Sequence, residues 1–229
     1  MNASPENTVG MSLGRLEAFS DGIFAVAVTL LVLNLNIGAL PPNVPGPMVL
    51  QLLLSQLVAL WPAYLGYFTT FMTVGMVWIG HHQMLRFFER IDETIQILNL
   101  LFLLFITLTP FTTNLLASNI WRTGTGADQV AVLVYGLNWL LNGLAFSLMW
   151  WYARRNYFLK PGISDVVIRG LTRNFMRNLV VIVIGLVVAF FSPLISLLIY
   201  LGITLFHASP VLRIFAKPPP PPTAKLPTP

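Results

Sequence analysis

A short polar segment, residues 15–22, opens a long apolar run near the start of the chain. Arg15, Glu17 and Asp21 are ionisable, and Ser20 carries a hydroxyl group. Charged side chains at membrane depth are costly, so they persist mainly where they are paired or border a pathway for ions or protons. This segment is therefore the first candidate for a functional site.

The acidic residues of this segment predict a partner on another helix. Glu17 and Asp21 are four residues apart, so on a helix they place like charges on one face, which is mildly unfavourable. Trp78 and His82 are also four apart, near the end of the second predicted membrane helix. Their indole and imidazole groups would lie at a similar depth and within reach of Asp21 or Ser20.

A second pattern follows the polar segment along the same predicted helix. Gly22, Val26, Thr29 and Leu33 recur at spacings of four, three and four, which places them on one stripe at 100° per residue. If several copies of the helix met around an axis, Val26 and Leu33 would form apolar collars and Thr29 a ring of hydroxyls. Apolar collars gate channels by dewetting, and oxygen rings replace part of an ion's hydration shell. The same stripe is also typical of ordinary helix packing.

Composition indicates the elements that must position these residues. The chain has 229 residues, of which 56% are hydrophobic and 9% charged, against roughly 25% charged in soluble domains. Several apolar runs approach the ~20 residues that cross a bilayer. We therefore predict an all-α polytopic membrane protein with a 13–216 helical domain, a cytosolic segment 1–12 and a proline-rich tail 217–229.

Six membrane helices are predicted. Their ranges are Leu13–Asn36, Pro62–Arg86, Ile95–Ala117, Val130–Tyr152, Leu179–Phe191 and Pro193–Phe206. The apolar run from Met48 to Arg86 would make a helix of about 60 Å, twice the hydrocarbon thickness. We therefore expect Trp61-Pro62 to break it and leave Met48–Leu60 as a short interfacial or re-entrant helix.

The basic residues predict the orientation of these helices. With a cytosolic start, twelve lie inside and only Arg122 lies outside, which places both termini in the cytoplasm. Trp61, Trp121, Trp150 and Trp151 are expected at the membrane interfaces. The twelve inside residues are Arg15, Arg86, Arg90, Arg154, Arg155, Lys160, Arg169, Arg173, Arg177, Arg213, Lys217 and Lys225.

Several chemistries are not expected. The chain has no cysteine, and the adjacent His81 and His82 would point apart, so we predict neither a metal site nor another cofactor. No nucleophile elbow, acid–base pair at membrane depth or Walker loop is present, so we expect no enzyme and no ATP-driven pump. The basic residues follow topology, so no nucleic-acid partner is predicted. The segment Thr73-Val74-Gly75-Met76 is similar to the start of the Thr-Val-Gly-Tyr-Gly filter of ordinary potassium channels, but it lacks the Tyr-Gly ending, so we do not expect a selectivity filter of that kind.

Three sequence features carry a resemblance to a known family. The pattern Arg15-x-x-x-Phe19-Ser20-Asp21 resembles the signature of the lysosomal potassium channel family of the transmembrane-protein-175 type, with its prokaryotic homologues. The pair Trp78-x-x-x-His82 and the run Leu60-Trp61-Pro62 are similar to that family too. The resemblance implies a homotetramer of six-helix units in a bacterial inner membrane, with lipids around it and K⁺ passing along a central pore lined by the first helix.

The resemblance also implies roles for individual residues. Val26, Thr29 and Leu33 would form the pore layers, with Gly22 on the same stripe, and the narrowest collar would fall at Val26 or Leu33. Residues that would hold the first helix in place are Arg15, Phe19, Ser20, Asp21, Trp78 and His82. Two other functions stay open: a proton pathway or secondary transporter that uses Asp21 and His82, and a membrane scaffold that docks through its proline tail.

Overall fold

The protein is built from helices. A computed structural model describes residues 12–215, so the expected tail 217–229 and all but the last residue of the segment 1–12 lie outside the described residues. The described chain holds seven α-helices and one 3₁₀ turn. In order they are α1 Leu13–Leu30, the 3₁₀ turn η1 Leu31–Asn34, α2 Gly46–Ala59, α3 Trp61–Arg86, α4 Glu93–Asn119, α5 Ala127–Arg155, α6 Asp165–Ala189 and α7 Pro193–Phe215.

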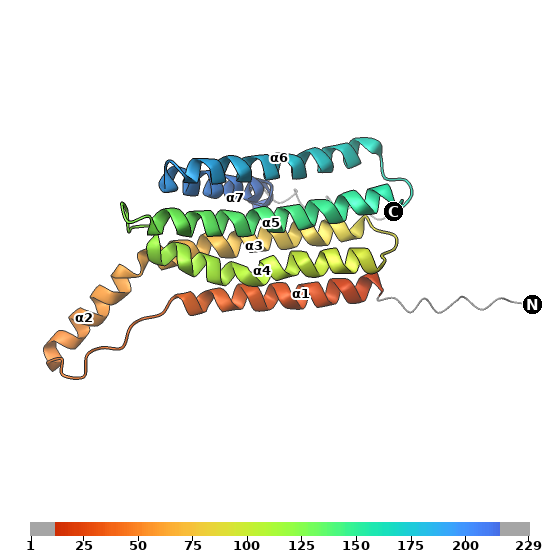
Figure 1. Cartoon of the computed structure of the whole chain (residues 1–229). Coiled ribbons are helices and arrows are strands. Elements are labelled where there is room, and N and C mark those ends of the chain that lie inside the picture. The colour runs from red at the N-terminus through yellow and green to blue at the C-terminus, as the bar shows by residue number, and fades with distance from the viewer. Residues whose placement is uncertain (1–11, 216–229) are drawn as a thin grey trace, which may run out of the picture.

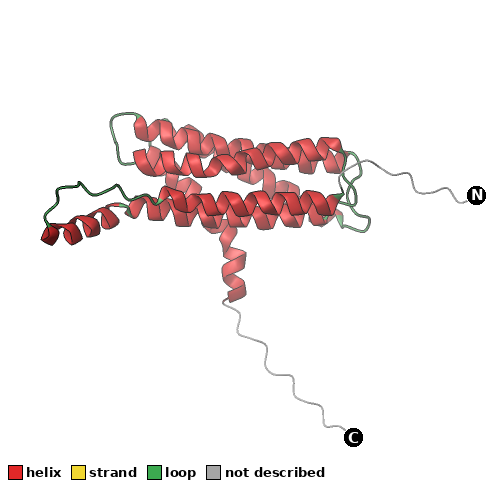
Figure 2. Ribbon diagram, turned by 90° about the horizontal axis from the view of Figure 1, so that it is seen from below, coloured by secondary structure: helices red, strands yellow, loops and turns green. Residues whose placement is uncertain are grey.

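Five long helices run side by side as a bundle, with α1 and α6 at opposite edges (Figure 1). Both α3 and α4 pack against α1, and α5 packs against α4 and α6. The last helix, α7, contacts α3, α5 and α6 and stands out from the side of the bundle (Figure 2). Helix α2 projects from one end and buries none of its residues within the chain.

Length and composition allow four of the described helices to cross a membrane: α1 with η1, α4, α5 and α6. The pair α2 and α3 bends by 42° at its junction and passes the same test as one broken span. The break falls at Trp61-Pro62 as predicted, because proline is favoured at the first positions of the new helix. The chain is thus an all-helical membrane protein, with four or five described spans against the six expected.

Several helix boundaries differ from the sequence predictions, and the sixth predicted helix, Pro193–Phe206, was too short because α7 continues to Phe215. The fifth predicted helix, Leu179–Phe191, was far too short, because α6 begins at Asp165 with the Ser164 side chain as its N-cap. Its first half is amphipathic: three arginines spaced by four residues share an exposed face, so polar residues lengthen the helix instead of ending it. The first helix was predicted too long, since η1 tightens its last turn and ends at Asn34.

The tryptophans divide between the surface and the core. Trp61 and Trp121 are exposed at the same end of the bundle, with ring centroids 5.2 Å apart, in keeping with an interfacial belt. Trp150 was wrongly expected in such a belt, because it is buried and its N–H donates to Thr172 Oγ1 at 3.0 Å. It belongs to a core cluster that also buries Leu16, at the start of α1.

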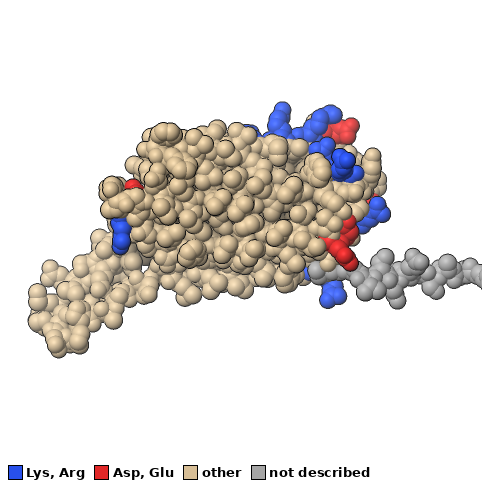
Figure 3. Space-filling view, in the orientation of Figure 1, with Lys and Arg blue, Asp and Glu red and all other residues tan. Residues whose placement is uncertain are grey.

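Charged side chains gather at the end of the bundle where α1, α4 and α6 begin (Figure 3). The loops at this end join α3 to α4 and α5 to α6, and they are tied together by backbone hydrogen bonds between Glu89 and Phe158 and between Lys160 and Phe87, at 2.8 and 2.9 Å. Arg122 lies in the α4–α5 loop at the other end. Apart from Arg122, most of the basic side chains drawn in Figure 3 lie toward the end where α1 begins, and the side of the membrane that this end faces stays a prediction.

Candidate functional site

Helix α1 presents two different faces. One is buried against the bundle through Leu16, Ser20, Phe24, Ala27 and Leu31, each at most 3% exposed. The opposite face carries the stripe predicted from sequence, Gly22, Val26, Thr29 and Leu33. All four are exposed, Val26 at 53% and Leu33 at 69%. No other element of residues 12–215 covers this stripe.

A buried polar chain fixes the rotation of α1 against two neighbours. The Ser20 hydroxyl donates to the Leu16 carbonyl at 2.8 Å and accepts from Asn99 Nδ2 at 2.9 Å. Asn99 Oδ1 in turn lies 2.8 Å from His81 Nε2. These three side chains belong to α1, α4 and α3, and all are buried. Because an unpaired buried polar group is costly, these hydrogen bonds favour one relative placement of the three helices.

A second contact joins α1 to α3 nearer the surface. The Trp78 indole N–H donates to Asp21 Oδ1 at 2.7 Å, so the predicted partner of this carboxylate is present. His82 stacks on Trp78, with ring centroids 6.2 Å apart and an interplanar angle of 26°. His82 was expected to reach Asp21 or Ser20, but its neighbour His81 holds the polar chain to Ser20.

The far end of α1 is also held by hydrogen bonds. Asn34 Nδ2 donates to the Pro110 carbonyl at 3.0 Å, and Asn114 Nδ2 donates to Asn34 Oδ1 at 3.1 Å. Both partners lie on α4, so η1 cannot move away from the bundle without losing these bonds. Sequence reasoning missed Asn34 and Asn99; polar side chains within apolar helices are the signal that marks them.

The hydroxyl of Thr29 is oriented within the exposed stripe. Its Oγ1 donates to the Val26 carbonyl at 2.8 Å, which uses the only hydroxyl hydrogen. The oxygen lone pairs are then the groups left for an external partner, and hydroxyl oxygens suit hard cations. Gly22 leaves the stripe open at its other end, since a Cβ there would meet nothing within 4 Å.

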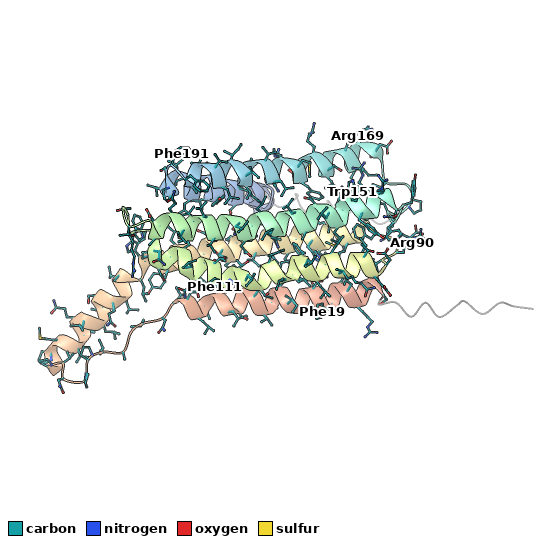
Figure 4. All side chains as sticks on the ribbon, in the orientation of Figure 1. Phe19, Arg90, Phe111, Trp151, Arg169 and Phe191 are labelled. Atoms are coloured by element: carbon teal, nitrogen blue, oxygen red, sulfur yellow. The ribbon has the colours of Figure 1, made fainter. Side chains whose placement is uncertain are left out.

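Two other residues of the predicted motif lie outside this network. Arg15 and Phe19 are both exposed, and Figure 4 labels Phe19 on α1. The residues with chemistry at the site thus fall into two groups. Ser20, Asp21, Trp78, His81 and Asn99 fix α1 to the bundle, whereas Val26, Thr29 and Leu33 face outward.

Comparison with known proteins gives these groups a context. The family described as "Endosomal/lysosomal potassium channel TMEM175" matches residues 15–110, which hold α1, α2, α3 and the first part of α4. A potassium channel of Streptomyces collinus is 35% identical over 163 residues, 71% of this chain and 75% of that protein. The chain belongs to the TMEM175 family. The contacts between α1, α3 and the start of α4 all fall in the part that the family shares.

Structures and animal relatives extend the comparison. The crystal structure of a lysosomal potassium-selective TMEM175 homolog from Chamaesiphon minutus superposes with a TM-score of 0.72 and 28% identity, over 86% of this chain and 97% of that one. The endosomal/lysosomal proton channel TMEM175 of Mus musculus is 38% identical over 101 residues, 42% of this chain but 19% of the mouse protein. This TMEM175 chain therefore shares nearly the whole fold of the first and a short part of the second.

Proposed function

We propose that this chain is the subunit of a potassium channel whose pore is lined by α1. The observation that carries the proposal is the uncovered stripe: Val26 and Leu33 expose large apolar surfaces while the opposite face of the helix is buried against the bundle. Relatives with the same shared segment are potassium channels. Copies of the chain that meet along this face would turn the stripe into stacked rings around an axis.

The proposed assembly is a homotetramer in a bacterial inner membrane, with both termini in the cytoplasm. Six spans per chain would be completed by α7, of which Pro193–Leu205 is apolar. The segregation of basic residues to the end where α1 begins supports a cytosolic location of that end. Four copies of α1 would give Val26 and Leu33 as apolar collars, with the Thr29 hydroxyls between them as partial ligands for K⁺.

The direct test of this function is recording from the purified chain in a planar bilayer with unequal KCl and NaCl solutions. We expect a passive current whose reversal potential follows the potassium gradient. A current that reverses near zero under a potassium gradient, or no current in a verified tetramer, would contradict the proposal. Saturating flux with a fixed proton stoichiometry would favour a transporter.

Proton conduction is a second candidate, because the animal relatives are proton channels. Asp21 and His82, the side chains expected to carry protons, both contact Trp78. Asp21 accepts a hydrogen bond from the Trp78 indole, and His82 stacks on the same indole. A pH gradient imposed in the same recordings separates the two functions. A reversal potential that follows the proton gradient would favour proton conduction.

A further inference from the structure

A cavity of about 190 Å³ lies on the side of α3 that faces away from α1. Helices α3, α5, α6 and α7 of one chain line it, and it is partly open to the surroundings. The outward stripe of α1 contributes no residue to its lining. Most of its wall is apolar, with Val77, Phe146, Phe175, Leu179 and Ile182 as large contributors. None of its described lining residues carries a charge, so an occupant would be uncharged.

One buried polar atom of the cavity wall, Ser147 Oγ, has no hydrogen-bond partner among the described residues, and Ser147 is 8% exposed. Two further buried polar groups of the wall have polar neighbours: the Trp139 indole lies beside the Tyr135 hydroxyl, and the Tyr200 hydroxyl lies beside Ser196. A buried polar group without a partner costs free energy that a bound hydroxyl or carbonyl would offset.

The size and chemistry of the cavity define its occupant. An apolar cavity of about 150 Å³ in another protein binds benzene. Ser147 supplies the polar contact, because its hydroxyl has no partner among the described residues and can both donate and accept a hydrogen bond.

We propose that this cavity is a binding site for a small uncharged ring molecule with one hydroxyl group, of the phenol class. The ring fills the apolar space among Val77, Phe146 and Phe175, and the hydroxyl pairs with Ser147. The apolar space and Ser147 are separate from the outward stripe that is proposed to line the pore. Binding of the ring molecule therefore does not depend on ion conduction.

The location of the cavity gives such a ligand a route to α1. Helix α3 lines it with Thr73, Val77 and Gly80, and holds α1 from another side through Trp78 and His81. A ligand in the cavity would therefore contact α3, the helix that positions α1 and its outward stripe. We expect the ligand to change the size of channel currents at concentrations that occupy the cavity.

The test uses 4-fluorophenol and the purified full-length chain in detergent, with fluorine NMR as the readout. Gly80 lines the cavity, and a Cβ there would meet nothing within 4 Å, so Gly80→Leu is the variant chosen to reduce the space. Gly170 is an equally open helical glycine outside the lining, so Gly170→Leu is the matched control. We expect saturable binding to the wild type and to Gly170→Leu, and at least a tenfold loss of affinity in Gly80→Leu.

Ser147→Ala tests the polar contact without filling the cavity. Loss of one hydrogen bond should weaken binding by about fivefold, the factor for a bond of ordinary strength. Non-saturable partition into detergent that is equal in all variants would overturn the proposal. So would a structure with 4-fluorophenol present in which ordered water alone occupies the cavity.

Discussion

At the scale of single residues, Thr29 is the one hydroxyl on the outward stripe, and its hydrogen is already used by the Val26 carbonyl. Thr29→Ala should therefore remove an oxygen ligand for K⁺ and lower the potassium-over-sodium permeability ratio. We expect the ratio to fall about tenfold, which corresponds to about 1.4 kcal/mol of differential ion binding. Bilayer reversal potentials measure it. Thr29→Ser keeps the oxygen and should keep most of the selectivity; an unchanged ratio in Thr29→Ala would contradict the role.

Leu33 is the most exposed apolar residue of the stripe, at 69% against 53% for Val26. If apolar collars form the barrier, Leu33→Ala widens one collar and should raise single-channel conductance, because a wider apolar constriction dewets less readily. Val26→Ala tests the other collar in the same recordings. The larger increase identifies the narrower collar, and no increase in either variant would exclude the stripe as the barrier.

Asn99 is the residue on which the hold on α1 depends. Asn99→Ala leaves the His81 ring nitrogen without its partner and removes the amide donor to Ser20, whose hydroxyl keeps its bond to the Leu16 carbonyl. A buried unpaired group costs about 1–3 kcal/mol. We expect a clear fall in thermal stability in detergent. Asn114→Ala, an exposed change on the same helix, should cost less than about 1 kcal/mol. Equal shifts in both variants would show that the buried chain contributes little.

Residue chemistry determined which contacts the sequence could predict. Asp21 has a like charge four residues away, and this mismatch indicated the partner found in Trp78. Asn99 gave no such indication, since it is one of four side-chain amides in the 27-residue helix α4 and its partners come from two other helices. His81 and His82 are adjacent, and only the rotation of α3 decides which of them is buried.

At the scale of elements, the placement of α7 depends on two glycines. A Cβ at Gly136 on α5 would fall inside contact distance of the Tyr200 hydroxyl, and one at Gly185 on α6 would meet the same ring. Gly136→Ala should therefore destabilise the bundle by about 1–3 kcal/mol through overpacking. Thermal unfolding of Gly136→Ala, Tyr200→Phe and the double variant forms a cycle. Additive effects would contradict direct contact, whereas partial recovery in the double variant is expected.

The start of helix α6 was predicted wrongly from the sequence, at Leu179 instead of Asp165. The predicted helix began at Leu179, where the uninterrupted apolar run starts, and left out the part of α6 that carries Arg169 and Arg173. Spacing of four instead keeps these side chains on one exposed face, while Ser164 caps the start. The outward stripe was easier to predict, because Gly22, Val26 and Thr29 lie on the regular helix α1, where spacing alone fixes a face, and only Leu33 lies in the 3₁₀ turn η1.

At the scale of the whole molecule, the question is which face of the bundle meets other copies. Val26 on α1 and Val187 on α6 are exposed to nearly the same degree, 53% and 54%, on helices at opposite edges of the bundle. Exposure in one chain therefore does not separate a pore face from a lipid face. The chain has no cysteine, so single cysteines can be placed at both positions in an otherwise unchanged protein.

Val26→Cys should cross-link between copies with a short bis-thiol reagent, because four α1 helices around an axis bring this position of neighbouring copies together. Val187→Cys should stay uncross-linked under the same conditions, since α6 lies at the far edge from α1. The measurement is the mass of the cross-linked species, in multiples of 25.5 kDa, beside the mass of the native complex. Cross-linking through Val187 alone, or a native mass of one chain, would move the assembly interface away from α1 and with it the pore.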